Sequence, residues 1–260
     1  MKEKIQYEDE ILKICAPDSL TFLVQPTVTM FKENYGRILK FFHLENYPQY
    51  QINWFDEQTK FREYIRAIRK DDSLPTYAVG TYDLDMCNQY VYVYIDKDKQ
   101  GIYKTINNEK KYLSKTAYHN FLCNPLHEFC HILYKNLAIP KQNKKRVVWL
   151  DEGLAQVLSG ETEYLNDKEA LKEFYEKVKA NTKEIPPLQG LKHGSAFVNE
   201  NYNMYDLSFL AIRYLFDTKS EEEIYHIVMD TEESNELGKT IMARMFTYYD
   251  EVLYNQKRVK

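Results

Sequence analysis

Hydrophobic residues in the first half of the chain recur at two different periods, which predicts a mixture of strands and helices. Ser19–Gln25 and Gln51–Phe55 are short apolar runs typical of strands, and Tyr90–Ile95 is the richest in the aromatic and β-branched residues that strands favour. Thr27–His43 and Asp56–Lys70 instead carry apolar residues at three- and four-residue steps, which predicts two helices.

Asp56 is placed to cap the second of these helices, and the segment 71–80, which contains Pro75 and Gly80, is predicted to be a loop. The later part of the chain has a mainly helical pattern. From about Ser114 onward, helices are predicted over 115–136, 148–159, 166–180, 204–217, 220–230 and 235–257. The sequence therefore predicts an α+β fold, with a small N-terminal α/β lobe that contains a mixed sheet over about 15–113, motif-bearing helices over 114–160, and a mainly helical lobe over 161–260.

Composition narrows the class of protein. Of the 260 residues, 44% are hydrophobic and 28% are charged, which is typical of a globular protein and excludes collagenous and wholly disordered chains. The net charge of −4 disfavours a nucleic-acid binder, which usually has a basic domain. The chain has no apolar run near the roughly 18–20 residues of a membrane span, no signal-peptide pattern and no C-x-x-C pair among its four cysteines. We therefore expect a cytoplasmic protein without nucleic-acid or membrane partners.

One short motif has the residues and the spacing of a zinc site. The segment reads His-Glu-Phe-Cys-His, and in a helix His127 and His131 lie one turn apart on the same face. Two imidazoles so placed can bind one Zn²⁺ ion, while Glu128 is placed to act as a general base on a metal-activated water. The preceding Asn124-Pro125 either begins this helix or kinks a longer one. The competing interpretation is a salt-bridged helix with two surface histidines.

A third ligand is predicted downstream, because a catalytic zinc has three protein ligands and one open position. Glu152, in the run WLDEGLAQ, follows His131 by 21 residues, which is enough chain to end one helix and bring a second alongside. Gly153 and Ala155 are expected to let this second helix approach the first closely. The competing interpretation is that Asp151 and Glu152 only interact with the dipole of their own helix.

The two segments together, HEFCH at 127–131 and WLDEGLAQ at 149–156, resemble the gluzincin group of zinc peptidases, whose third ligand is a Glu in a W-L-x-E-G-x-A segment. The aminopeptidase-N-like family is its best-known branch, and its interval between the two segments is close to, but not identical with, the interval here. The chain is also similar to short peptidase-MA-like domains, in which a small α/β lobe leads into the H-E-x-x-H helix. The resemblance is sharp over 127–156 and weaker over 186–215.

The resemblance implies a single zincin-like catalytic domain over 1–260, with the active-site cleft between the two lobes. It implies one Zn²⁺ ion, held by His127, His131 and Glu152. The chain departs from the aminopeptidases because it has no G-x-M-E-N signature; its nearest counterpart, 77–81, lacks the Glu that binds a free amino terminus. Aminopeptidase activity is therefore in doubt.

By the same resemblance, a Tyr on a later helix directs its hydroxyl toward the oxyanion of the tetrahedral intermediate. Tyr205 fits the position of that Tyr best, and Tyr202, one turn away, is the alternative. His193, in a predicted loop, is expected to be solvated and is not assigned to the catalytic group.

Residues near the two motif segments are expected to have supporting or structural roles. Asp151 and Gln156 are candidates to accept a hydrogen bond from a metal-bound histidine. Cys130 is expected to fill the core rather than approach the metal. The basic stretch Lys141–Arg146 is expected to be a solvated loop that joins the motif helices; the alternative is that it steers acidic substrates to the site.

The predicted function is zinc-dependent hydrolysis of a peptide or protein substrate, with Glu128 as general base. Tyr90–Ile95, if it lies at the sheet edge, can bind an extended peptide by strand addition. One alternative is a catalytically silent gluzincin-like module that binds a peptide or protein, and another is a helical structural protein with a chance motif. The sequence does not distinguish an endopeptidase from an exopeptidase and does not define the oligomeric state.

Overall fold

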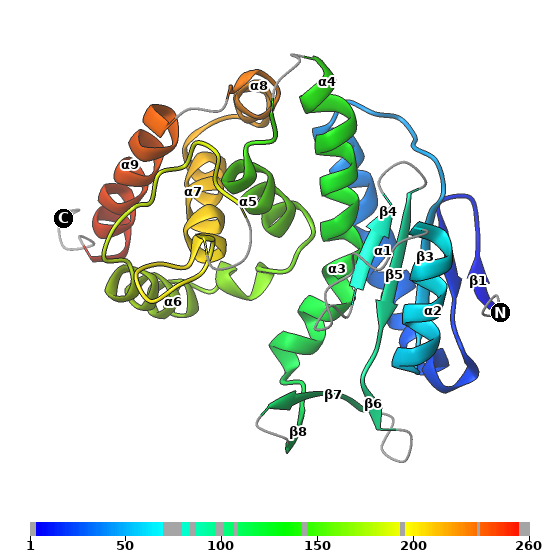
Figure 1. The fold of residues 1–260 in the computed structure, drawn as a ribbon. Coiled ribbons are helices and arrows are strands. Elements are labelled where there is room, and N and C mark those ends of the chain that lie inside the picture. Colours follow the sequence, from blue (N-terminus) through cyan, green and yellow to red (C-terminus); the bar gives the residue numbers. More distant parts are fainter. Residues whose placement is uncertain are drawn as a thin grey trace. The chain divides into compact units, whose positions relative to one another are not determined.

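A computed structural model describes residues 4–69, 80–83, 87–96, 101–106, 109–141, 145–192, 196–232 and 235–254 of the chain. The chain divides into two units, Met1–Ile132 and Leu133–Lys260, and each is described by itself (Figure 1). The first unit contains both strands and helices, and helices make up nearly all of the regular structure described in the second. The predicted α+β class is therefore confirmed.

The first unit contains a five-stranded mixed sheet with the strand order β1-β2-β3-β5-β4. Its strands are β1 (Ile5–Glu8), β2 (Leu12–Cys15), β3 (Tyr50–Phe55), β5 (Asn88–Tyr92) and β4 (Gly80–Asp83). The three central strands run parallel, while β1 and β4 are antiparallel to their neighbours at the two edges. The mixed sheet that the sequence predicted is thus present, and β3 matches the predicted strand Gln51–Phe55.

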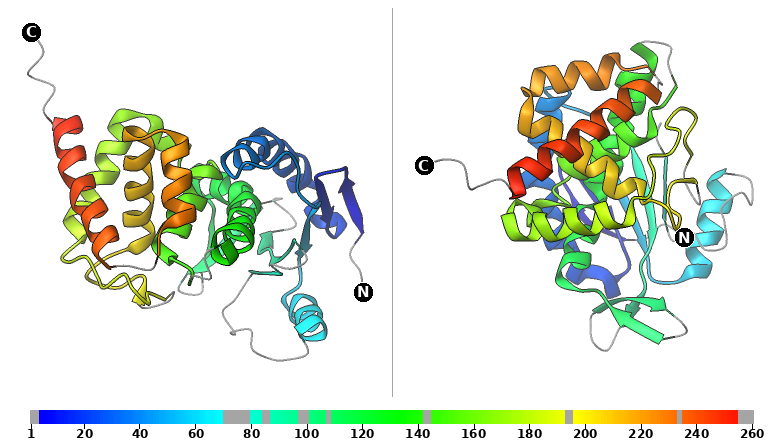
Figure 2. Two further views of the ribbon diagram at one scale, coloured as in Figure 1. Left: turned by 90° about the horizontal axis from the view of Figure 1, so that it is seen from above. Right: turned by 90° about the vertical axis from the view of Figure 1, so that its left-hand side faces the viewer.

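The described part of the first unit also contains a smaller antiparallel sheet and three α-helices. The small sheet consists of β6 (Ile95–Asp96), β7 (Gly101–Ile106) and β8 (Glu109–Tyr112), and the helices are α1 (Thr21–Phe41), α2 (Gln58–Arg69) and α3 (Lys115–Leu133). Figure 2 shows α1 and α2 on opposite faces of the five-stranded sheet.

The alternation of side chains along β3 explains how one sheet holds helices on both faces. Tyr50 stacks on Phe31 of α1, with ring centroids 5.6 Å apart, and meets Phe129 of α3 edge-on at 5.7 Å. Phe55, an odd number of residues further along, points to the other face and contacts Phe61 of α2 at 5.7 Å. All five rings are almost fully buried, so β3 is the centre of the core of this unit.

The strand predicted at Ser19–Gln25 is wrong. This segment forms a short 3₁₀ turn, Asp18–Leu20, that leads directly into α1. Its buried residues Leu20, Leu23 and Val24 lie at steps of three and four, so the run fits a helical period as well as a strand. Asp56, predicted to cap the second helix, lies two residues before α2 and accepts a hydrogen bond from the Ser19 hydroxyl at 2.7 Å.

The run Tyr90–Ile95 is divided between β5, which ends at Tyr92, and β6, which begins at Ile95, and β5 is not at the edge of its sheet. β5 is parallel to β3 on one side and antiparallel to β4 on the other, with Val91 opposite Gly80. The condition for strand addition to this run, a position at the sheet edge, is not met, because β4 pairs with β5 on that side. β4 falls in a segment with no strand signal in the sequence. Its four residues begin at the last residue of the predicted loop 71–80, the rest of which lies outside the described residues.

Helix α3 carries the H-E-x-x-H segment and runs without interruption through Pro125. Of the two possibilities left by the sequence, the longer helix is therefore present, and Asn124-Pro125 does not begin it. The helix is fixed to the sheet by a hydrogen bond from the Gln89 side-chain amide to the Asn124 side-chain carbonyl at 2.5 Å. Phe121 adds a ring contact with Trp54 of β3 at 6.3 Å.

The second unit begins with a π-helical turn, Tyr134–Ala138, that continues from α3. Its helices are α4 (Ile139–Lys141), α5 (Val148–Leu158), α6 (Lys168–Asn181), α7 (Met204–Thr218), α8 (Glu221–Asp230) and α9 (Asn235–Tyr254), with a 3₁₀ turn at Glu163–Asn166. The predicted helices after residue 147 match α5 to α9 to within three residues at each end. No helix in the described part of the chain has the length and apolar character required to cross a bilayer.

Helix α5 is the core of this unit and lies beside α7 (Figure 1). Every residue from Trp149 to Leu158 is buried. Gly153 faces α7 so closely that a Cβ atom added there would lie 2.3 Å from the backbone oxygen of Ser208. The sequence assigned Gly153 to an approach between the two motif helices; the structure shows that its missing side chain makes room for α7.

Gly153→Ala is expected to destabilise the protein by about 1–3 kcal/mol, because the new methyl group overlaps the backbone of α7 and the Ile212 side chain. Gly36→Ala is the matched control, since Gly36 is exposed within α1 and its added Cβ meets nothing within 4 Å. The control should stabilise the protein by about 0.5–1 kcal/mol through helix propensity. Urea unfolding of both variants measures the difference, and equal effects on the free energy of unfolding would contradict the close approach of α5 and α7.

Candidate metal centre

The two histidines of the motif are presented on one face of α3, because its other face is buried against the first unit's core. Leu126 and Phe129 are fully buried, and the Phe129 ring also stacks on Tyr35 of α1 at 5.4 Å. His127 and His131, one turn apart, have ring centroids 4.7 Å apart at an interplanar angle of 85°. His131 is 6% exposed and His127 is partly buried. The sequence pattern of apolar positions thus fixes which face carries the imidazoles.

Glu152 lies near the start of α5 and is 3% exposed. The beginning of this helix is fixed by the Tyr134 hydroxyl, which accepts a hydrogen bond from the backbone N–H of Val147 at 3.3 Å. Burial and the nearby Asp151 carboxylate raise the pKa of Tyr134, so the phenol stays protonated at neutral pH. The hydroxyl is therefore a stable partner for the turn that leads into α5.

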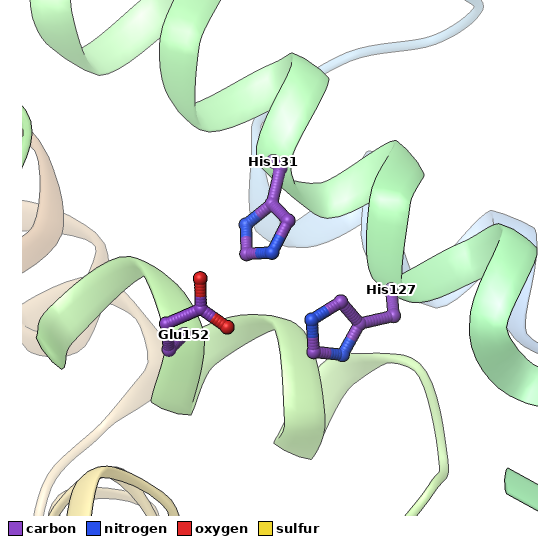
Figure 3. A group of neighbouring side chains, drawn as sticks. All are labelled: His127, His131 and Glu152. Carbon is purple, nitrogen blue, oxygen red and sulfur yellow. The ribbon is translucent and has the colours of Figure 1, made fainter. Parts of the chain in front are cut away.

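The structure brings the three predicted ligands together. One donor atom from each of His127, His131 and Glu152 lies within 4.8 Å of the other two. Figure 3 shows the Glu152 carboxylate directed toward both imidazole rings. No other group of three or more His, Cys, Asp or Glu side chains in the described residues has this arrangement.

The donor set fits a zinc ion. Two imidazole nitrogens and one carboxylate oxygen are ligands of catalytic zinc sites, which leave a fourth position open. Donors at about 2.1 Å from one tetrahedral ion are about 3.4 Å apart. The three donor atoms here lie within 4.8 Å of one another. Cys130 is 1% exposed and does not belong to the donor group, in agreement with its predicted core-filling role.

Arg146 is a residue of the site that sequence reasoning missed. Its Nη2 donates to Glu152 Oε1 at 3.0 Å, and its Nε donates to Asp151 Oδ2. The stretch Lys141–Arg146 was expected to be a solvated loop, but the Arg146 side chain is only 28% exposed and is paired with two buried carboxylates. The physical reason is that buried carboxylates need a positive partner, and Arg146 lies five and six residues before them.

Asp151 and Glu152 do more than interact with the helix dipole. Asp151 is 1% exposed, and both carboxylates form ion pairs with the same guanidinium group. Asp151 and Gln156 were the candidates for a hydrogen bond with a metal-bound histidine, and both have other partners in the structure. Asp151 accepts a hydrogen bond from Arg146, and Gln156 Nε2 donates to the backbone carbonyl of Tyr205 at 3.2 Å. Their predicted contact with a histidine stays a prediction.

Glu128 and the two tyrosines lie where their helices place them. Glu128 follows His127 on α3 and is partly buried. Tyr205 is in the first turn of α7, 38% exposed, with its ring 4.6 Å from Phe197. Tyr202 precedes the helix, and its hydroxyl donates to the backbone carbonyl of Ala196 at 3.2 Å. His193 and most of the segment 77–81 lie outside the described residues.

Comparison with known proteins adds no family. The chain matches no protein-family model, and no curated protein matches it with significant sequence similarity.

Glu152→Ala is expected to weaken zinc binding by more than the roughly 10–100-fold that follows loss of an outer partner of a ligand, because it removes a ligand itself. Competition with a chromophoric chelator measures the dissociation constant. Glu163→Ala, which removes an exposed carboxylate from the 3₁₀ turn after α5, is the control and should bind zinc like the parent. Parental zinc affinity in Glu152→Ala would remove this residue from the ligand set.

Proposed function

We propose that this protein is a zinc-dependent metallopeptidase of the gluzincin type. The proposal is carried by the close approach of donor atoms from His127, His131 and Glu152. The H-E-x-x-H and W-L-x-E-G-x-A patterns identify the same three residues from the sequence alone. Glu128 lies between the two histidines in sequence, at the position of the general base in this class of site. The zincin-like arrangement, with the catalytic cleft between the α/β lobe and the helical lobe, is part of the proposal.

A Zn²⁺ ion held by His127, His131 and Glu152 would act as a Lewis acid toward the scissile carbonyl and would lower the pKa of a water toward about 7. Glu128 accepts one proton from the water as the water oxygen forms a C–O bond to the carbonyl carbon. It then passes that proton to the nitrogen of the leaving amine as the peptide C–N bond breaks. Glu128 is partly buried on α3, next to His127 in the sequence.

Tyr205 is proposed to donate its hydroxyl proton in a hydrogen bond to the oxyanion that develops on the scissile carbonyl. Its backbone is tied to the helix of Glu152 by the hydrogen bond from Gln156. Tyr202 is less suited to the role, because its hydroxyl is bonded to Ala196.

Substrate binding by strand addition is proposed for β4 rather than for the run Tyr90–Ile95. Among the described strands β4 is the last in the sheet order, with β5 as its neighbour on one side, so the backbone groups on its outer side are directed away from β5. An extended peptide paired there would gain main-chain hydrogen bonds irrespective of its sequence.

Glu128→Gln is expected to retain zinc and to lower kcat by about 10²–10⁴-fold, because the amide cannot accept the proton of the water. Digestion of a peptide library followed by mass spectrometry supplies a cleaved sequence on which the rates are measured. Glu173→Gln on the exposed side of α6 is the control. Zinc binding without cleavage of any sequence by the parent protein would instead support a catalytically silent peptide- or protein-binding module.

Tyr205→Phe is expected to lower kcat by about 10²–10³-fold with little change in KM, since the lost hydrogen bond forms mainly in the transition state. Tyr202→Phe removes a hydroxyl from the same region and is expected to keep kcat close to that of the parent. Steady-state kinetics on the same peptide distinguish the two, and the opposite order of effects would transfer the role to Tyr202.

A further inference from the structure

We infer that Arg146 is a positioning residue that holds the Glu152 carboxylate in the orientation in which it binds metal. The inference rests on the proposed function, since it concerns the same ligand set. Arg146 contacts Glu152 Oε1 through Nη2 at 3.0 Å and contacts Asp151 through Nε. Two different N–H groups of one planar guanidinium therefore meet two carboxylates.

Arg146 is itself held in place at two points. Asp151, whose side chain is 2% exposed, is the buried anchor for Nε. The next residue, Val147, donates its backbone N–H to the buried Tyr134 hydroxyl at 3.3 Å. The chain immediately after Arg146 therefore cannot swing without breaking a buried hydrogen bond, and the guanidinium is fixed relative to the first turns of α5.

This arrangement matters because Glu152 is the ligand with the most freedom. Its side chain has one more rotatable bond than a histidine, and a free carboxylate can turn either oxygen toward an ion. A bond from Arg146 to Oε1 orients the plane of the carboxylate before any ion arrives. Ligands that are oriented by an outer hydrogen-bond partner lose less conformational entropy on binding, and loss of such a partner typically costs about 10–100-fold in metal affinity.

Arg146 could act by compensating charge or by orienting the Glu152 carboxylate, and the two roles predict different zinc affinities for a lysine variant. If Arg146 only balances the charge of Asp151 and Glu152, a lysine at this position would serve equally well. If Arg146 positions Glu152, a lysine variant would bind zinc more weakly. A single ammonium on a flexible stem cannot reproduce the contacts of Nε with Asp151 and of Nη2 with Glu152. Arg146→Lys is therefore the decisive variant, because it keeps a positive charge beside Asp151 and Glu152.

The experiment measures the zinc dissociation constant of the full-length protein by chelator competition and records the visible absorption spectrum of its Co²⁺ form. Arg146→Lys and Arg146→Gln are compared with Lys145→Gln, which removes an exposed charge from the neighbouring position. We expect both Arg146 variants to bind zinc about 10–100-fold more weakly, with altered Co²⁺ absorption bands, and Lys145→Gln to match the parent. Circular dichroism confirms that each variant compared is folded; if Arg146→Gln is not, Arg146→Lys decides the question.

Parental zinc affinity and a parental Co²⁺ spectrum in Arg146→Lys would overturn the positioning role while leaving the metal site intact. Asp151→Asn gives a second test, because it weakens the anchor of Arg146 but leaves both Arg146 and Glu152 in the chain. Parental zinc affinity in Asp151→Asn would also overturn the positioning role. Absence of stoichiometric zinc in the parent protein would be a different result, because it would refute the proposed metal site itself.

Discussion

Glu152 is a carboxylate held almost completely away from water, and the account of this protein depends on the groups that compensate its charge. An ionised carboxylate is costly to bury unless it is paired and hydrogen-bonded. Arg146 provides one positive group, which is shared with the buried Asp151. When both acids are ionised, these three side chains sum to one negative charge. Their surroundings therefore favour a cation, and one donor atom from each of two imidazole rings lies within 4.8 Å of an oxygen of the Glu152 carboxylate.

Core packing within each unit supports the helix that carries its proposed ligands. In the first unit, the aromatic cluster around Phe129 and the hydrogen bond between Gln89 and Asn124 fix α3 on the sheet. In the second unit, α5 is buried along its length, and Gly153 lets it contact α7 backbone to backbone. Metal ligands supported by rigid helices lose little freedom when an ion binds, which is the physical advantage of placing them on helices rather than loops.

Much of this arrangement could be predicted from the sequence because its signals are local. The helices after residue 147 show clear three- and four-residue periods, and the H-E-x-x-H spacing defines one helical face whatever the fold around it. The strands were harder: β1, β2 and β4 are four residues long each, too short for alternation to be recognised, and Ser19–Gln25 fits both periods. β4, which pairs with the outer side of β5, was therefore not predicted.

Arg146 escaped prediction for a different reason. Its role comes from a tertiary contact with Asp151 and Glu152, and in sequence it is the last member of a run of basic residues that looks like a solvated loop. Gly153 was recognised as a site of close approach, but the partner helix could not be identified because neither periodicity nor composition specifies which helices meet.

The most direct test of the central claim is anomalous X-ray diffraction at the zinc edge from crystals of the full-length protein supplied with zinc. The account predicts one strong peak, with a nitrogen of His127, a nitrogen of His131 and a carboxylate oxygen of Glu152 each at about 2.0–2.2 Å from it. A zinc peak bound by other residues, or the absence of any ordered zinc at these three side chains, would contradict it.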